Sequence, residues 1–182
     1  NAHKLKEIRQ VLAHLPYEII SLKDLGIDYD IPETGSTLEE NATIKSKFLA
    51  ERYPEYHIIS EDTGLEIDAL DGAPGVITAR YGGPERDAQK NMDKVLSQLS
   101  DREDQSGQFR TIISHIYQGK EAQYEGIVRG RIATEQSGKN GFGYDPIFIP
   151  KRKKITFGEM KASEKYKIDH RFKAFKKIKK FF

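Results

Sequence analysis

The stretch Ser60-Glu61-Asp62-Thr63-Gly64 decides how the first half of the chain is interpreted, because it places two adjacent carboxylates directly after the apolar pair Ile58-Ile59. The apolar pair predicts a strand, and the acids and glycine that follow predict a turn at its end. Two desolvated anions at such a place are costly unless a cation compensates them. A divalent metal is the simplest compensation, so the stretch indicates a site built from oxygen ligands.

A helix is predicted upstream of this turn, and the loop before it carries a third acid. Ser36-Thr37-Leu38-Glu39-Glu40 offers two overlapping capping boxes, Ser36 with Glu39 or Thr37 with Glu40, for a helix that runs to about Tyr53. Glu33 lies just before this helix. Carboxylates from two loops, Glu33 together with Glu61 and Asp62, suit Mg²⁺, which uses one or two protein carboxylates plus waters and substrate phosphates. The alternative is that these acids are solvated caps.

Periodicity and turn residues predict the remaining elements. Helices are predicted at His3–Leu15, at Arg86–Leu99 and over most of Ser163–Phe182, and strands at Tyr17–Ser21, His57–Ser60, Leu65–Asp68, Phe109–Tyr117 and Tyr124–Ala133. The last two strands are expected to form a long hairpin. This order predicts a mixed α/β fold in one compact unit of residues 1–182, with an elongated central sheet flanked by helices and two lobes around a cleft.

Composition narrows the chemistry. The chain has 182 residues, of which 37% are hydrophobic, and it contains no cysteine. Disulfides, thiolate nucleophiles and cysteine-based zinc sites are therefore excluded. No apolar stretch approaches the roughly 20 residues that a membrane span needs, so a cytosolic protein is expected. The net charge of +2 hides acids between Asp24 and Asp71 and lysines in the last quarter. A metal-holding region and a phosphate-holding region could thus face each other, although a solvated basic tail is the plainer interpretation.

A second unusual stretch, Gly141-Phe142-Gly143-Tyr144-Asp145-Pro146, places two aromatic rings between glycines and ends with an acid. Phe142 and Tyr144 could stack on a purine while Asp145 accepts a hydrogen bond from a ring N–H. A core aromatic loop held by Pro146 is an equally good explanation from local sequence.

Basic side chains form three further groups. Lys4 lies in the first turn of the first helix, after Asn1-Ala2-His3, where free backbone N–H groups favour an anion. Lys45 follows one turn after Asn41. Lys165 and His170-Arg171 could donate to a phosphate or a keto oxygen. The alternative for each of these basic residues is a surface position or a structural ion pair with an acid. No glycine fingerprint of a Rossmann or P-loop site is present.

Taken together, these motifs resemble those of the inosine triphosphate pyrophosphatase family, the non-canonical purine nucleoside triphosphate pyrophosphatases. They occur in the family's order over nearly the whole chain. The matching motifs are Asn1-Ala2-His3-Lys4, Glu33-Thr34-Gly35, Glu40-Asn41-Ala42, Ser60-Glu61-Asp62-Thr63-Gly64-Leu65, Gly72-Ala73-Pro74-Gly75, Ala79-Arg80-Tyr81, Gly141-Phe142-Gly143-Tyr144-Asp145-Pro146 and His170-Arg171.

The resemblance implies Mg²⁺-dependent hydrolysis of inosine, deoxyinosine and xanthosine triphosphates to the monophosphate and pyrophosphate, in a homodimer. Asp62 matches the general base, Glu33 and Asp62 the metal ligands with Glu61 as an additional one, and Thr63 a substrate contact. The residues that match positions neutralising the triphosphate are Lys4, Lys45 and Lys165. Those that match the base pocket are Phe142, Gly143, Tyr144, Asp145, His170 and Arg171, and Asn1, Ala2 and His3 are expected to bind the substrate as well. A donor from Arg171 or His170 would select a 6-keto group, since adenine would leave that donor unpaired.

Two departures and two rivals accompany this resemblance. The family places a strand before the Asn-x-x-Lys segment, so we expect the native polypeptide to be longer at this end. Glu61-Asp62 stands where many bacterial relatives have two aspartates. The rival hypotheses are a Maf-like pyrophosphatase acting on pyrimidine or modified nucleotides and a basic nucleic-acid-binding module. For the homodimer, the loop Ala73–Gly83 is the expected contact.

Overall fold

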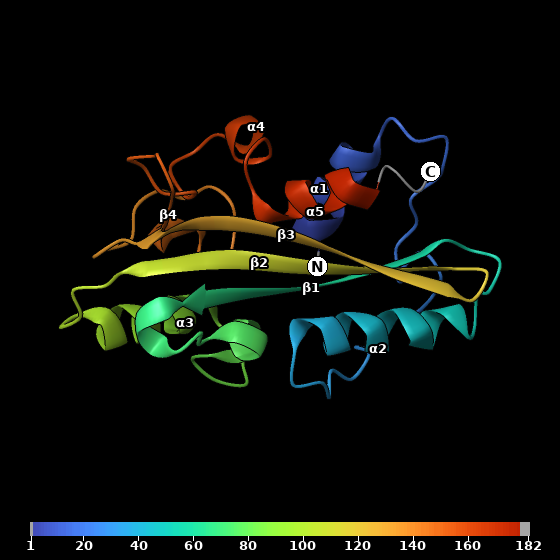
Figure 1. Cartoon of the computed structure of the whole chain (residues 1–182), viewed down its shortest axis with the longest axis horizontal. Coiled ribbons are helices and arrows are strands. Elements are labelled where there is room, and N and C mark those ends of the chain that lie inside the picture. Colours follow the sequence, from blue (N-terminus) through green and yellow to red (C-terminus); the bar gives the residue numbers. More distant parts are fainter. Residues whose placement is uncertain (1, 179–182) are drawn as a thin grey trace.

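A single antiparallel sheet organises the fold. The computed structural model describes residues 2–178, and within them the sheet has four strands in the order β1-β2-β3-β4. The strands are β1 (Ile58–Ile67), β2 (Ser106–Tyr117), β3 (Lys120–Ile132) and the short β4 (Phe148–Pro150). The first three are long and lie side by side along the longest dimension of the molecule (Figure 1). The predicted hairpin at residues 109–133 is β2 with β3, and its register pairs Tyr117 with Lys120.

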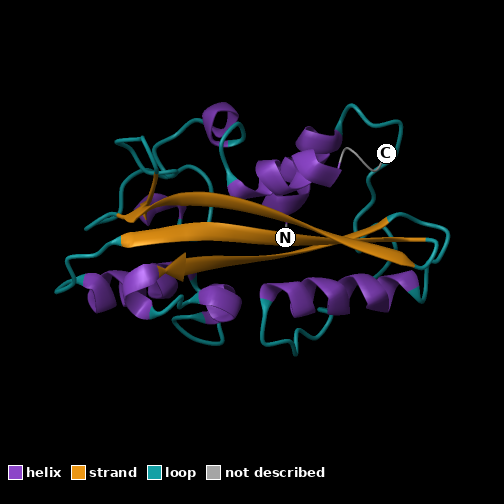
Figure 2. Ribbon diagram, viewed as in Figure 1, coloured by secondary structure: helices purple, strands orange, loops and turns teal. Residues whose placement is uncertain are grey.

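Helices lie on both sides of this sheet (Figure 2). The α-helices are α1 (Ala2–Leu12), α2 (Leu38–Ala50), α3 (Ala88–Leu99), α4 (Ala162–Lys165) and α5 (His170–Ile178), and the 3₁₀ turns are η1 (Asp68–Leu70), η2 (Gly75–Arg80) and η3 (Asp145–Ile147). Neighbouring residues of β2 show which helix covers which face. Ile112 packs with Leu38 of α2, whereas Ile113 packs with Phe175 of α5. Since successive side chains of a strand point to opposite faces, α2 covers one face, and α1 and α5 cover the other.

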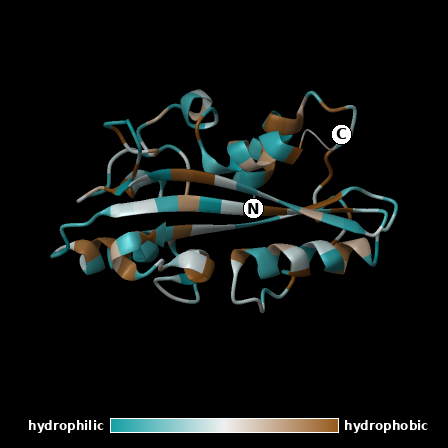
Figure 3. Cartoon of the chain, viewed as in Figure 1, coloured by the Kyte–Doolittle hydropathy of each residue, from teal (hydrophilic) through white to brown (hydrophobic). Residues whose placement is uncertain are grey.

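Separate apolar clusters fill the two ends of the sheet. One, around Phe109, Phe148 and Phe157, joins α3 to β4, and another joins Leu49 of α2 to Ile58 of β1. Both hydrophobic and hydrophilic residues occur along the long strands (Figure 3). The mixed α/β class with a helix-flanked sheet is thus confirmed. Among the described helices, none is long and apolar enough to cross a membrane.

The start of α2 follows one of the two predicted capping boxes. The Thr37 hydroxyl accepts from the Glu40 N–H at 3.1 Å, and the Glu40 carboxylate accepts from the backbone N–H groups of Ser36 and Thr37. The Thr37 box therefore forms. It fixes the position at which the loop carrying Glu33 meets the helix.

Two predicted elements are wrong. The acidic stretch at residues 60–64 is no turn, because β1 runs unbroken from Ile58 to Ile67 and pairs with β2 throughout. Residues 17–21 form no strand. The Arg9 guanidinium binds the Ile19 carbonyl at 3.0 Å and holds the segment as an irregular connection. The prediction that most of Ser163–Phe182 is helical holds for the described residues, which form two helices, since Asp169 caps a new helix by accepting from the Phe172 N–H at 2.6 Å. Residues 179–182 lie outside the described residues.

Candidate active site

Asp62 and Glu33 meet at one lysine on the α2 face of the sheet. Lys45 donates to Glu33 Oε1 at 2.7 Å, to Asp62 Oδ1 at 3.1 Å and to the backbone carbonyl of Glu61 at 2.8 Å. That carbonyl is accessible because β1 is the edge strand of the sheet. The structure therefore joins the loop before α2, the second turn of α2 and the middle of β1, as the sequence predicts for Glu33, Asp62 and Lys45.

The two carboxylates differ in their electrostatics. Burial, and to a lesser extent the nearby Glu33, raise the pKa of Asp62 against the opposing charge of Lys45. Burial would also raise the pKa of Glu33, but the Lys45 ammonium outweighs this effect, and the pKa of Glu33 is lowered. A carboxylate with a raised pKa is the stronger base, so Asp62 is the better proton acceptor of the two.

The same carboxylates suit a divalent cation. Asp62 is 8% exposed, and its Oδ2 has no hydrogen-bond partner among residues 2–178. An uncompensated buried carboxylate oxygen of this kind calls for a cation or a proton donor. No group of three or more His, Asp or Glu side chains gathers as a metal cage in the described chain. Two hard oxygen ligands, open to substrate phosphates, nevertheless match Mg²⁺ better than a full protein cage would.

Glu61 does not join this pair, which corrects the expectation that it is an additional metal ligand. Because residues 60–64 continue the strand, the side chain of Glu61 points to the face opposite Asp62. There it accepts from Arg171 Nε at 2.7 Å and Nη2 at 3.0 Å, and forms an ion pair with Lys4 at 2.9 Å. Burial would raise the pKa of Glu61, but Arg171 and Lys4 outweigh it and hold the pKa far below its usual value.

Glu7 extends this contact into a buried chain of alternating charges. It accepts from Arg171 Nη1 and forms an ion pair with Lys165 at 3.4 Å, and Lys165 in turn donates to Asp145 at 2.7 Å. Glu7 is 5% exposed. We did not predict a role for Glu7 from the sequence. Its position one turn after Lys4 on α1 was the only available signal, and an acid there is usually a surface residue.

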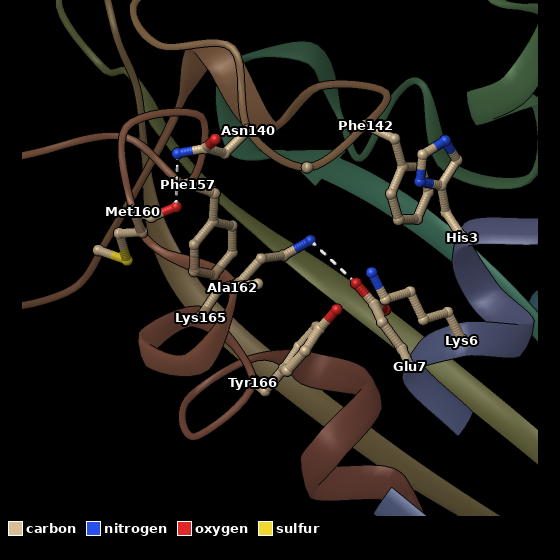
Figure 4. Close-up of a pocket in the computed structure, with 11 residues that line it drawn as sticks. His3, Lys6, Glu7, Asn140, Phe142, Phe157, Met160, Ala162, Lys165 and Tyr166 are labelled. Atoms are coloured by element: carbon tan, nitrogen blue, oxygen red, sulfur yellow. Dashed lines mark hydrogen bonds and ion pairs between the residues drawn. The ribbon is translucent and has the colours of Figure 1, made fainter. Parts of the chain in front are cut away.

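A cavity of about 180 Å³ opens beside this chain of charges (Figure 4). Its lining residues come from the start of α1, the loop before η3, and α4 with its flanks: His3, Lys6, Glu7, Asn140, Gly141, Phe142, Phe157, Met160, Ala162, Lys165 and Tyr166. The Phe142 ring stacks on His3 at 5.3 Å between centroids, and the Lys165 ammonium lies 5.0 Å from its centre. A flat ring system could stack there.

Other predicted site residues lie elsewhere. Tyr144 is in the apolar core, 3% exposed, and its hydroxyl donates to the Thr78 carbonyl at 2.6 Å. Thr63 shares a hydrogen bond of 2.7 Å with Thr111 on the Glu61 face. His170 is buried and stacked on Phe109 at 4.8 Å.

Three predicted substrate-binding residues remain, namely Gly143, Asn1 and Ala2. Gly143 has a φ of 61° in the loop beside Phe142, a conformation that favours glycine. Asn1 lies outside the described residues. Ala2 begins α1, and only its backbone is described.

Comparisons with known proteins agree on one family. A sequence model of the Ham1 family matches residues 1–181. A relative from Bacillus subtilis (strain 168) called "dITP/XTP pyrophosphatase" is 43% identical and aligns over 99% of this chain and 92% of its own length. One from Christiangramia forsetii with the same name is 41% identical over 100% and 94%.

Solved structures give the same result. The Ham1 protein of Staphylococcus aureus has a TM-score of 0.90 at 35% identity, and a HAM1 protein from Coxiella burnetii has one of 0.91 at 35% identity. Each comparison covers 100% of this chain and 93% of the other protein.

Proposed function

Since the chain belongs to the Ham1 family, we propose that its site hydrolyses non-canonical purine nucleoside triphosphates, dITP, ITP and XTP, to the monophosphate and pyrophosphate. The chain is accordingly a nucleoside triphosphate pyrophosphatase. The observation that carries the proposal is the buried Asp62 carboxylate, with one oxygen unpartnered among residues 2–178 and Lys45 and Glu33 beside it. The family assignment supports this function over the Maf-like and nucleic-acid-binding hypotheses.

Asp62 would act as the general base. Its raised pKa and unpartnered Oδ2 suit it to accept a proton from an attacking water. Lys45 stays charged, because Asp62 and Glu33 raise its pKa more than burial lowers it. Its ammonium can therefore neutralise negative charge on the phosphate oxygens. Lys4, which binds Glu61 at the edge of β1, would contribute a second cation from the other side of the strand.

Glu33 and Asp62 are the residues that would hold a divalent cation, for which we propose Mg²⁺. When bound, such an ion would shield the triphosphate charge and polarise the phosphorus centre. Lys45 now occupies the space between the two carboxylates and would have to share them. Its long side chain allows it to move toward the phosphates while keeping one carboxylate.

The cavity beside Phe142 is the proposed base pocket. Its aromatic and apolar lining suits a purine, and Lys165 brings a donor to its wall. Arg171 is less suited to read the 6-keto group than the resemblance implies, because it is 1% exposed, is held by Glu61 and Glu7, and is not among the residues that line the cavity. Lys165 has two acceptors among the described residues and a third N–H, so we assign the 6-keto contact to Lys165.

Release of pyrophosphate from dITP, XTP, ATP, GTP and dTTP, with and without Mg²⁺, tests the proposal. Asp62→Asn should abolish metal-dependent turnover of dITP. Asp68→Asn, the same chemical change at an exposed ion pair with Arg129, should leave it intact. Turnover of ATP at the rate of dITP would refute the substrate class, and full activity of Asp62→Asn would refute the base.

We propose in addition that the enzyme is a cytosolic homodimer with no nucleic-acid partner, and that the loop Ala73–Gly83 lies in the dimer contact. Light scattering during size-exclusion chromatography would test the dimer. Ile77 in this loop is 40% exposed, so Ile77→Asp should produce a monomer if the loop is the contact. A variant that remains dimeric would contradict the assignment of the loop.

A further inference from the structure

Asn41, on the first turn of α2, has a buried side-chain amide whose oxygen is hydrogen-bonded and whose nitrogen has no partner among residues 2–178. Its Oδ1 accepts from the Gly35 N–H at 2.8 Å, and the residue is 0% exposed. That donor fixes which side of the amide is oxygen. Nδ2 therefore points away from Gly35, and it has no acceptor among residues 2–178. A buried amide donor without a partner costs free energy, so a ligand that accepts from it is favoured.

Asn41 also ties the loop that carries Glu33 to the helix. A side chain at residue 35 would place a Cβ 2.6 Å from Glu40 Cβ and 2.8 Å from Asn41 Oδ1, so the loop packs directly on the first turn of α2. Glu33 is two residues before this contact and is bound from the helix by Lys45. The loop is thus held at two points, one turn apart on α2.

Two contacts hold the start of α2, which carries Asn41, against the part of β1 that carries Asp62. Lys45, one helical turn after Asn41, binds Asp62. Ser60, two residues before Asp62 on the same face of β1, donates to the carbonyl of Ala42, the residue after Asn41, at 2.5 Å. Asp62 therefore lies against the turn of α2 that runs from Asn41 to Lys45. Within residues 2–178, its Oδ2 is an acceptor without a donor, and Nδ2 of Asn41 is a donor without an acceptor.

We propose that Asn41 is a positioning residue for the hydrolysis: Nδ2 donates a hydrogen bond to the water that Asp62 Oδ2 deprotonates, while Oδ1 holds the Glu33 loop. A water accepts from one group and donates to the other, so a single molecule pairs both orphan atoms. The Asn41 N–H donates its hydrogen bond to one lone pair of the water oxygen. The second lone pair of that oxygen is then directed at the phosphorus. The O–H proton passes to Asp62 as the new O–P bond forms and the bridging O–P bond breaks. This inference depends on the proposed function.

Two variants separate the two halves of the amide. Asn41→Asp keeps an acceptor for Gly35 and replaces the donor with oxygen, whereas Asn41→Leu removes both. Both should lower kcat for dITP at saturating Mg²⁺ by about 10- to 100-fold, the loss expected for one buried hydrogen bond to a reacting group. Binding of a non-hydrolysable α,β-methylene dITP, measured by calorimetry, should change less than threefold, because the water is not part of the substrate.

Ser46→Ala is the matched control, since Ser46 is also a buried polar residue of α2 and bonds Ser114 at 2.7 Å away from the site. It should lower stability and keep kcat. Mn²⁺ affinity, followed by electron paramagnetic resonance, should weaken in Asn41→Leu, where the Glu33 loop is released.

Three results would overturn the inference. If Asn41→Asp keeps kcat and Asn41→Leu loses it, the residue is only a loop clamp. If both variants weaken analogue binding in proportion to the loss of kcat/KM, Nδ2 binds a phosphate oxygen instead of the water. If the wild-type protein releases no pyrophosphate from dITP, the proposed function fails and the inference falls with it.

Discussion

Removing Glu7 should destabilise the fold more than removing any exposed acid of similar size. Glu7→Ala deletes the central anion of the buried chain and leaves Lys165, whose side chain is 4% exposed, and Arg171, 1% exposed, with one carboxylate each. Arg171 is not among the residues that line the cavity, so water does not readily replace the lost partner at that cation. Breaking a buried pair in this way costs about 3–5 kcal/mol. Because Arg171 keeps both bonds to Glu61 and Lys165 keeps its shorter bond to Asp145, we expect about 3 kcal/mol.

Urea unfolding followed by circular dichroism measures this loss. A change of about 3 kcal/mol is roughly a hundredfold in the unfolding equilibrium constant. Glu7→Gln keeps the shape and one acceptor, so it should cost about 1.5–3 kcal/mol. Glu85→Ala is the control, since Glu85 pairs with Lys90 at 3.6 Å where both side chains are more than half exposed, and it should change stability by about 0.5 kcal/mol or less.

The reasoning would be refuted if Glu7→Ala and Glu85→Ala lost the same stability. That result would mean that water enters the charge chain freely, so the ions are solvated and not held in one geometry. If Glu7→Gln were as stable as the wild type, the hydrogen bonds alone would hold the chain together, and the charge of Glu7 would contribute nothing.

Four further predictions follow from the structure. Glu61→Gln should flatten the pH dependence of stability below about pH 4.5, the ordinary pKa of glutamate, because a carboxyl whose folded pKa is depressed contributes stability that is lost as the pH falls through that pKa; an acid limb identical to that of the wild type would contradict it. Asp169 is the opposite case, since burial raises its pKa from 3.8 to about 6. Urea titrations should therefore show the wild type losing stability relative to Asp169→Asn as the pH rises between these values, and equal slopes would disprove the shift. Gly126→Ala should cost about 2–3 kcal/mol in thermal or urea unfolding, because its Cβ would overlap the His170 carbonyl and displace α5, whereas a neutral effect would show that α5 moves freely. Phe142→Leu should raise KM for dITP roughly 10-fold by loss of ring stacking while kcat is kept, and an unchanged KM would place the base elsewhere.

Local signals in the sequence predicted much of the frame. The Thr37 capping box, the helix that ends in Leu99 and the β2–β3 hairpin each depend on neighbouring residues, so short patterns identify them. The split of the C-terminal helix also had a local cause, the Asp169 cap, but the lysines around it continue a helical pattern and conceal it. The assembly of the site could be predicted only through the resemblance, because the contacts that build it are long-range. Glu7 and Arg171, for example, are 164 residues apart.

The acidic stretch shows why adjacency in sequence gave the wrong geometry. Glu61 and Asp62 would repel each other in a turn, but in a strand their side chains point to opposite faces, where different helices neutralise them. Lys45 of α2 pairs with Asp62, whereas Lys4 of α1 and Arg171 of α5 pair with Glu61. The cost of two buried anions is therefore met by protein cations, and the strand continues.

This arrangement makes Glu61 the joint between the two halves of the site. Its backbone carbonyl binds Lys45 on the side of the proposed general base, and its carboxylate binds Arg171, which continues through Glu7 to Lys165 at the proposed base pocket. The distance between the proposed base-reading donor and the proposed general base is thus set by one residue of an edge strand and a chain of buried ion pairs. The contacts therefore join Lys165, which lines the cavity, to the strand that carries Asp62 through Glu7, Arg171 and Glu61.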